Sequence, residues 1–317
     1  MRNKRLGALV LSVFVFIFLF GCSASPSPAK TPALPSAAAD FPLTVQDDSG
    51  QTLVFNGPPQ RIISLSPGNT EILYALGKGS SVIVTDKYSD YPQENTLKAK
   101  LTTYPKPNIE ELVSLQPDLI IVLVEATDFI QQMKSRGIKV LKLFPEDFDR
   151  ALENIELLGR ITGAQSQAKQ ITDDMRRRAS AVISRTKSVS RPRVLYELDA
   201  SDETRPFVAG STGFFANLVP LAGGRNIFDD LGAPSGRVST EQIVARDPEI
   251  IILGDATLPY SPQTPEMVKS RLNWGGITAV KSGRIYTMND AWLSRAGPRL
   301  VDGLEAMAKL LHPELFP

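Results

Sequence analysis

Five side chains that suit ligand binding fall in loops beside predicted strands. In open α/β sheets, ligands bind beyond the carboxyl ends of the strands. Aromatic faces with a few directed donors suit a large, partly apolar small molecule. Taken alone, each residue could equally pack on its own lobe, but their common placement predicts a ligand cleft. The five residues are Tyr88, Tyr104, Trp292, Arg295 and Arg299.

The side chains that most catalytic and metal sites need are missing. The only histidine, His312, follows the last predicted helix and is expected at the surface, and the only cysteine is Cys22. These counts exclude His/Cys metal sites and Ser-His-Asp or Cys-His catalytic sets. Neither a P-loop nor a G-x-G-x-x-G motif follows a strand. Carboxylate-pair chemistry stays open, but no pair stands out, so we interpret the protein as non-catalytic, without cofactor or metal.

One stretch occurs twice and indicates two similar lobes. Residues 108–122 (NIEELVSLQPDLIIV) and 239–253 (STEQIVARDPEIIIL) align without a gap. Each is typical of a capped helix, a turn at proline and a buried strand. A capping box uses the third helical residue of each copy, which leaves Glu110 and Glu241 free. Acids favour helix N-termini in any protein, so the residues alone leave a function for this pair open.

Strands and helices alternate on both sides of a long amphipathic segment. The predicted fold class is therefore α/β, with two Rossmann-like lobes of mostly parallel sheet joined by a long backbone helix. The N-terminal lobe covers residues 41–146 and begins with a hairpin. The connecting segment, 147–190, is predicted as one long helix or two helices end to end. The C-terminal lobe covers residues 191–317.

The first forty residues are predicted to target the chain rather than to fold. Residues 1–21 have a basic start and an apolar run that is short for a membrane span, as in a signal peptide. The end of this run resembles a bacterial lipoprotein signal, in which Cys22 would be lipidated; an uncleaved anchor is the alternative. Residues 22–40 are rich in Pro, Ser and Ala and are predicted to be a disordered linker. Both alternatives predict an extracytoplasmic protein attached to a membrane.

Five motifs together resemble the periplasmic binding proteins of ABC importers for cobalamin and iron-siderophores, and the cobalamin-binding members most of all. In chain order they are RIISLSPGNTEILYALG, YSDYP, NIEELVSLQPDLIIV, VSTEQIVARDPEIIIL and WLSRAGPRL. The resemblance covers about Arg61–Leu311. It implies a monomer that holds cobalamin or a related corrinoid between two lobes, with modest closure. It also implies delivery to an ABC permease dimer with its ATPase subunits.

The resemblance implies roles for single residues in the cleft. Tyr88 matches a tyrosine that packs on the corrin ring, and Tyr104 falls where the cobalamin binders have a tryptophan. Trp292 falls on the first residue of an aromatic pair, and Arg299 on an arginine near the ligand.

Outside the cleft, Glu110 and Glu241 match two glutamates on the lobe surfaces that dock onto permease arginines. With a net charge of +1 and no basic patch, nucleic acid is not an expected partner.

Two departures from the pattern of the cobalamin-binding members leave the identity of the ligand open. Ser235 stands where the cobalamin binders have a second tryptophan, and Leu293 replaces an aromatic ring. A ferric siderophore or haem is therefore the alternative ligand, and Tyr88, Tyr91 or Tyr104 could serve a haem iron. Two other classes are weaker: a tethered hydrolase, which the lack of histidine disfavours, and an adhesion scaffold with an empty cleft.

Overall fold

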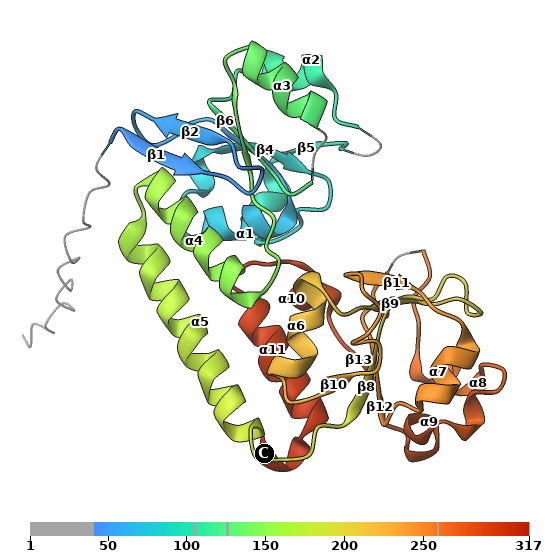
Figure 1. Ribbon diagram of the computed structural model, residues 1–317. Helices are drawn as coiled ribbons and strands as arrows, with labels where there is room; N and C mark the ends of the chain where they lie inside the picture. Colours follow the sequence, from blue (N-terminus) through green and yellow to red (C-terminus); the bar gives the residue numbers. More distant parts are fainter. Residues whose placement is uncertain (1–40, 104–105, 125–126, 259, 317) are drawn as a thin grey trace, which may run out of the picture. The chain divides into compact units, whose positions relative to one another are not determined.

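The computed structural model describes residues 41–103, 106–124, 127–258 and 260–316, which form two large sheets flanked by helices and a separate two-stranded hairpin (Figure 1). The predicted signal segment, the linker with Cys22, and Tyr104 lie outside the described residues. None of the helices within these ranges combines the length and apolar character that a bilayer crossing needs. The predicted α/β class is confirmed, because both sheets are mostly parallel.

The first sheet has five parallel strands in the order β5-β4-β3-β6-β7. Every residue of the central strands β3 and β6 is buried, as expected for a parallel sheet covered on both faces. The strands are β3 (Ile62–Leu65), β4 (Val82–Asp86), β5 (Ala99–Leu101), β6 (Leu119–Val122) and β7 (Lys139–Lys142). The helical segments between them are α1 (Pro67–Ala75), η1 (Gly79–Ser81), η2 (Gln93–Leu97), α2 (Ile109–Ser114) and α3 (Thr127–Ser135).

The predicted hairpin is present and packs against the first lobe. Its strands, β1 (Leu43–Gln46) and β2 (Thr52–Phe55), pair antiparallel. The Asp47 carboxylate accepts hydrogen bonds from the backbone of the turn and from the Lys142 backbone N–H on β7. The hairpin is thereby fixed to the edge of the first sheet.

The second sheet has the strand order β11-β9-β8-β12-β13, and β10 also pairs with β8. The pairs of β8 with β10 and β12, and of β12 with β13, are parallel, whereas β9 and β11 form an antiparallel edge. The strands are β8 (Arg193–Asp199), β9 (Phe207–Ala209), β10 (Arg225–Asn226), β11 (Ser235–Arg237), β12 (Ile250–Leu253) and β13 (Ile285–Thr287). The helical segments are α6 (Gly213–Leu221), α7 (Thr240–Arg246), α8 (Pro265–Ser270), η3 (Trp274–Gly276), α9 (Thr278–Ser282), α10 (Asp290–Ser294), α11 (Leu300–Leu311) and η4 (Pro313–Leu315).

Both copies of the repeated stretch adopt the predicted helix, turn and strand. Asn108 accepts a hydrogen bond from the Glu111 backbone N–H at 3.2 Å, which caps α2 before β6. Ser239 and Gln242 make the full reciprocal capping box at α7, before β12. The two lobes thus repeat one local unit, as its sequence indicated.

The connector differs from the prediction. It consists of two helices, α4 (Phe148–Thr162) and α5 (Gln165–Thr186), which pack side by side rather than end to end (Figure 1). Gly163 ends α4 in the left-handed conformation, with φ 69°, which glycine adopts without strain. A Cβ on Gly159 would lie 2.4 Å from the Ala168 Cβ, so glycine here permits the close contact of the two helices.

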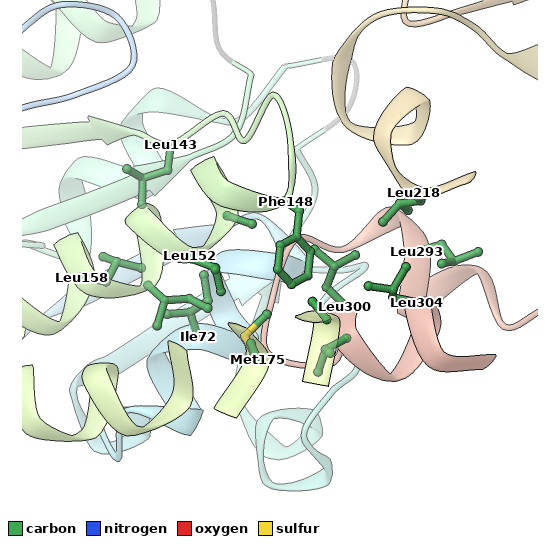
Figure 2. Close-up of a cluster of buried hydrophobic side chains, with 14 of the residues drawn as sticks. Ile72, Leu143, Phe148, Leu152, Leu158, Met175, Leu218, Leu293, Leu300 and Leu304 are labelled. Atoms are coloured by element: carbon green, nitrogen blue, oxygen red, sulfur yellow. The ribbon is translucent and has the colours of Figure 1, made fainter. Parts of the chain in front are cut away.

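One hydrophobic core runs through both lobes. It includes Ile72 on α1, Leu152 on α4, Met175 on α5, Leu218 on α6 and Leu304 on α11. Figure 2 shows these side chains meeting around α4, α5 and α11. The connector is therefore part of the core and not a free hinge.

Candidate ligand-binding site

A cavity of about 380 Å³ is lined by both lobes. The first lobe contributes the start of α1 and the segments that follow β4, β6 and β7. The second contributes the start of α6, the residues around the beginning of β11, and α10 with the residues after it. Aromatic and apolar side chains at its wall include Tyr88, Leu123, Phe144, Pro145, Phe214 and Pro234. Polar side chains at its wall are Ser66, Asn69, Ser235, Asp290, Ser294 and Arg295.

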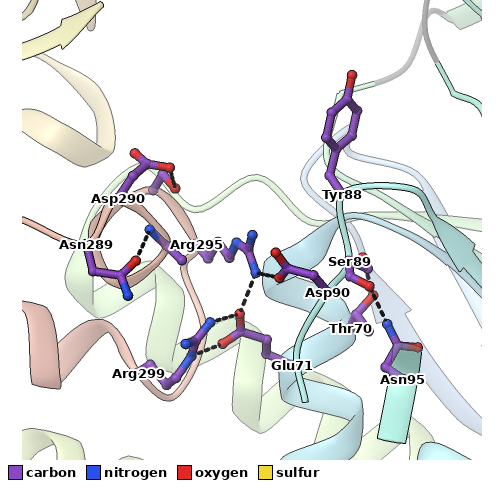
Figure 3. Close-up of polar contacts among 12 residues, drawn as sticks. Thr70, Glu71, Tyr88, Ser89, Asp90, Asn95, Asn289, Asp290, Arg295 and Arg299 are labelled. Atoms are coloured by element: carbon purple, nitrogen blue, oxygen red, sulfur yellow. Dashed lines mark hydrogen bonds and ion pairs between the residues drawn. The ribbon is translucent and has the colours of Figure 1, made fainter. Parts of the chain in front are cut away.

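Tyr88 stands on a loop that a buried polar network holds in place. Its backbone N–H donates to Asp86 Oδ1 at 2.7 Å, and the Ser89 hydroxyl donates to Asp86 Oδ2 at 2.6 Å. Asn95 and Lys100 both donate to the Ser89 carbonyl. The Tyr88 ring itself is 53% exposed and points away from this network (Figure 3). The backbone is thus fixed, and the ring stays exposed to a ligand although the Lys87 ammonium lies 5.0 Å from its centre.

Two arginines of the second lobe contact two acids of the first lobe (Figure 3). Arg299 binds the buried Glu71 carboxylate through Nε at 2.8 Å and Nη2 at 2.5 Å. Arg295 uses Nη1 to reach Glu71 at 3.4 Å and Asp90 at 2.5 Å. The hydrogen bond from Arg295 lowers the pKa of Asp90. Because each arginine faces an acid, the four groups together carry no net charge.

The structure brings only part of the predicted cleft set together. Tyr88 and Arg295 line the cavity, whereas Arg299 lies behind Glu71, with its guanidinium 3.8 Å from the centre of the Tyr91 ring. Trp292 lines a separate surface groove beside α5 and α11. The geometry of α10 explains this: Asp290 and Ser294, four residues apart, face the cavity, so Trp292, midway between them, faces away. Tyr104 is outside the described residues.

Several wall residues were not predicted from the sequence. Phe144 and Phe214 add aromatic surface, and Asn69 adds a buried amide. Ser235, where the resemblance places a tryptophan, does line the cavity. Position in the chain is the signal that could have indicated Phe144, Asn69 and Phe214. Phe144 follows a strand, and Asn69 and Phe214 lie at the starts of helices, at the carboxyl edges of the sheets.

The expectation that His312 is a surface residue is wrong. Its side chain is buried, and Nε2 lies 3.1 Å from the Gly223 carbonyl oxygen. The chain after α11 turns back onto the second lobe, which covers the ring. His312 therefore packs within that lobe and does not line the cavity.

The second lobe also contains a fully buried ion pair. Arg271 donates to both carboxylate oxygens of Glu197, at 2.6 and 2.8 Å, and to Gln263 at 2.8 Å. Nearby, Asp255 accepts the Ala200 N–H through Oδ2. Burial, then the charge of Glu197, raises the pKa of Asp255 to about 7. Among the described residues, no cluster of His, Cys, Asp and Glu has an arrangement that would hold a metal ion.

Glu110 and Glu241 are both exposed in the first turns of α2 and α7. The ion pairs found among the described residues involve neither carboxylate. A hydrogen bond from Ser239 lowers the pKa of Glu241. Each lobe thus presents one member of this pair at its surface, outside the cavity.

Residues 62–291 match the family described as periplasmic binding protein. An uncharacterised ABC transporter substrate-binding lipoprotein of Bacillus subtilis, YvrC, is 29% identical over 284 residues, which are 87% of this chain and 87% of that relative.

Two solved structures share the fold at comparable similarity. The periplasmic vitamin B12-binding protein of Vibrio cholerae has a TM-score of 0.70 at 26% identity, covering 82% of this chain and 99% of that one. A possible iron-binding periplasmic solute-binding protein of Staphylococcus epidermidis has a TM-score of 0.69 at 30% identity, covering 80% and 99%. The names of these two proteins point to different ligands.

Proposed function

Since the chain belongs to the periplasmic binding protein family, we propose that it captures cobalamin or a related corrinoid outside the cytoplasm and delivers it to an ABC import permease. Family membership also makes it a non-enzymatic transport component, in agreement with the missing catalytic residues. The observation that carries the ligand proposal is the exposed Tyr88 ring on a rigid loop at an aromatic cavity between two lobes.

The size and charge of the cavity agree with a corrinoid held by one part of its surface. Pockets of about 300–1,000 Å³ enclose drug-sized ligands, and a corrinoid is larger than these. It would insert one edge and leave the remainder at the mouth, against Tyr88. Because Arg295, the arginine at the wall, already faces Glu71 and Asp90, the wall does not favour a highly charged ligand.

The direct test is binding to the full-length chain in detergent. After incubation with cobalamin and gel filtration, the protein fraction should carry the corrinoid absorbance, and titration calorimetry should give a micromolar or tighter dissociation constant. Tight binding of a ferric siderophore with no cobalamin binding would contradict the corrinoid proposal while leaving the importer class intact.

Haem or a ferric siderophore is the second candidate. It is favoured by the free Tyr88 phenol, since tyrosine can ligate haem iron, and by the similarity to a possible iron-binding protein. Haem ligated by Tyr88 should show a phenolate charge-transfer band that Tyr88→Phe abolishes. Corrinoid stacking would survive that substitution.

Delivery is proposed to use Glu110 and Glu241. Each is exposed on a different lobe, so a permease dimer with basic surface residues could contact both at once. The ligand cavity and this surface are separate, which lets the protein dock while its ligand is bound.

Attachment to the membrane is proposed to run through lipidated Cys22, the only cysteine. The relative YvrC is named a lipoprotein. In a bacterial host, Cys22→Ser should move the protein from the membrane fraction to the soluble extracytoplasmic fraction. Unchanged membrane association of that variant would favour the uncleaved anchor.

A further inference from the structure

The helix α1 begins at the cavity without a side-chain cap. Ser66, its N-cap residue, is a capping residue type but makes no cap bond, and the first turn contains no acid. Asn108, Asp147, Ser239 and Thr264 cap helices whose first turns do not line the cavity, whereas Asn289 caps α10, whose first residue lines it. In the second lobe, α6 also begins at the cavity, and Thr212 before it makes no cap bond.

The amino end of α1 therefore offers hydrogen-bond donors to the cavity. The first N–H groups of a helix have no acceptor within the helix, and the start of a helix carries partial positive charge. Gly68 and Asn69 provide these N–H groups at the wall. The absence of a Cβ at Gly68 lets the Ala296 backbone of the second lobe approach this end of α1, since a Cβ there would lie 3.2 Å from the Ala296 nitrogen.

The Asn69 side chain is an independent sign of a ligand group at this place. Asn69 lines the cavity and is only 5% exposed, yet its Nδ2 has no hydrogen-bond partner among the described residues. A buried donor without a partner is costly, and such a cost is offset when a ligand supplies the acceptor. Arg295, at the same wall, makes its ion pairs through Nη1, so its Nε and Nη2 groups can donate hydrogen bonds to a ligand.

We propose that the amino end of α1 and the Asn69 amide form a subsite for acceptor oxygens on the ligand. This inference rests on the proposed corrinoid function and specifies which part of the ligand enters the cavity. A corrinoid carries two sources of such oxygens: the carboxamides around its ring and the phosphodiester of its nucleotide loop. The donors of α1 take either oxygen, with the aromatic wall against the ring edge.

Two substitutions of Asn69 test the subsite in the full-length chain. Asn69→Asp replaces the donor with an acceptor of the same shape, and should weaken cobalamin binding about tenfold or more by calorimetry. An acid in the first turn stabilises a helix, so the melting temperature should not fall. Asn69→Ala removes the donor without adding charge and should weaken binding less. Asn108→Asp makes the same change at the start of α2, away from the cavity, and should leave affinity unchanged.

Cobinamide, which keeps the carboxamides but lacks the phosphodiester, separates the two sources. An equal loss for cobalamin and cobinamide in Asn69→Asp assigns the subsite to a carboxamide oxygen. A loss confined to cobalamin assigns it to the phosphate. Wild-type affinity in both Asn69 variants overturns the subsite alone. Failure of the wild type to bind either compound overturns the proposed corrinoid function, and the subsite with it.

Discussion

At the residue scale, Tyr88 combines a fixed backbone with an exposed ring. Hydrogen bonds from the Tyr88 backbone and the Ser89 side chain to Asp86 fix the loop. Little conformational entropy of the loop should therefore be lost when a ligand stacks on the ring. We expect Tyr88→Ala to weaken corrinoid binding about tenfold and Tyr88→Phe to change it little, because stacking needs the ring and not the hydroxyl. Calorimetry measures both. Tyr260→Ala, which removes another exposed tyrosine, is the matched control, and an equal loss there would contradict a specific role for Tyr88.

Asp255 predicts a pH dependence of stability. Its pKa in the folded protein is about 7, above the usual value of about 3.9 for an unfolded chain. A raised pKa means that the folded state holds the proton more tightly, so this contribution to stability is full below about pH 4 and is lost as the pH rises through 7.

The substitution Asp255→Asn isolates this contribution. Asparagine cannot ionise and keeps an oxygen that accepts the Ala200 N–H. As the pH rises from 5 to 8, the unfolding free energy of the wild type should therefore fall by a few kcal/mol relative to that of the variant. Urea denaturation at the two pH values measures this. A difference that does not change with pH would show that Asp255 is already ionised at pH 5.

The sequence predicted which edges of the sheets border the cavity better than which side chains line it. Tyr88 and Arg295 line the cavity because the segments that follow strands lie at the edge of a sheet. Trp292 lies at another groove because it stands on the short helix α10, and a loop pattern in the sequence does not show which way the side chains of such a helix point. Asn69 was missed because a missing hydrogen-bond partner is a property of three-dimensional packing.

At the scale of elements, local signals predicted most of the fold. The caps Asn108 and Ser239 and the prolines after each helix fix the repeated unit within a few residues. The α4–α5 hairpin was mispredicted because a continuous amphipathic pattern does not tell whether a left-handed glycine, Gly163, reverses the chain. The short strands β9 and β11 form an edge whose pairing depends on neighbours distant in sequence.

Glu110 on α2 and Glu241 on α7 are exposed on different lobes, which leads to a prediction about docking. Glu110→Lys and Glu241→Lys together should leave ligand affinity unchanged and lower affinity for the permease at least tenfold, mainly through slower association. Surface plasmon resonance with the permease in nanodiscs measures this, and the effect should shrink as salt rises.

Matched reversals at neighbouring acids control for net charge. Glu111→Lys lies one residue along α2, and Glu266→Lys lies in the first turn of α8. These two changes together should weaken docking far less. Weaker ligand binding in the Glu110 and Glu241 variant would place these residues in ligand capture instead of docking.

At the scale of the whole molecule, the shared core limits how far the lobes can move. Leu152 and Met175 of the connector pack with Ile72 from one lobe and Leu304 from the other. Close-packed interiors resist gradual deformation, and the contacts of Glu71 with Arg295 and Arg299 add polar links between the lobes. A large closure of the two lobes would have to break these contacts. We therefore expect only small movements of the lobes when a ligand binds.

This rigidity can be measured as a distance. With Cys22 replaced by serine, spin labels at Ser114→Cys on α2 and Ser282→Cys on α9 report on the two lobes separately. We expect the distance between the labels, measured by pulsed electron paramagnetic resonance, to change by less than about 2 Å on ligand binding. Leu152→Ala should cost about 2–5 kcal/mol by opening a void in the shared core, and should broaden the distance distribution. A ligand-induced shift of many ångströms in the wild type would mean that the core slides or separates, and that the connector acts as a hinge after all.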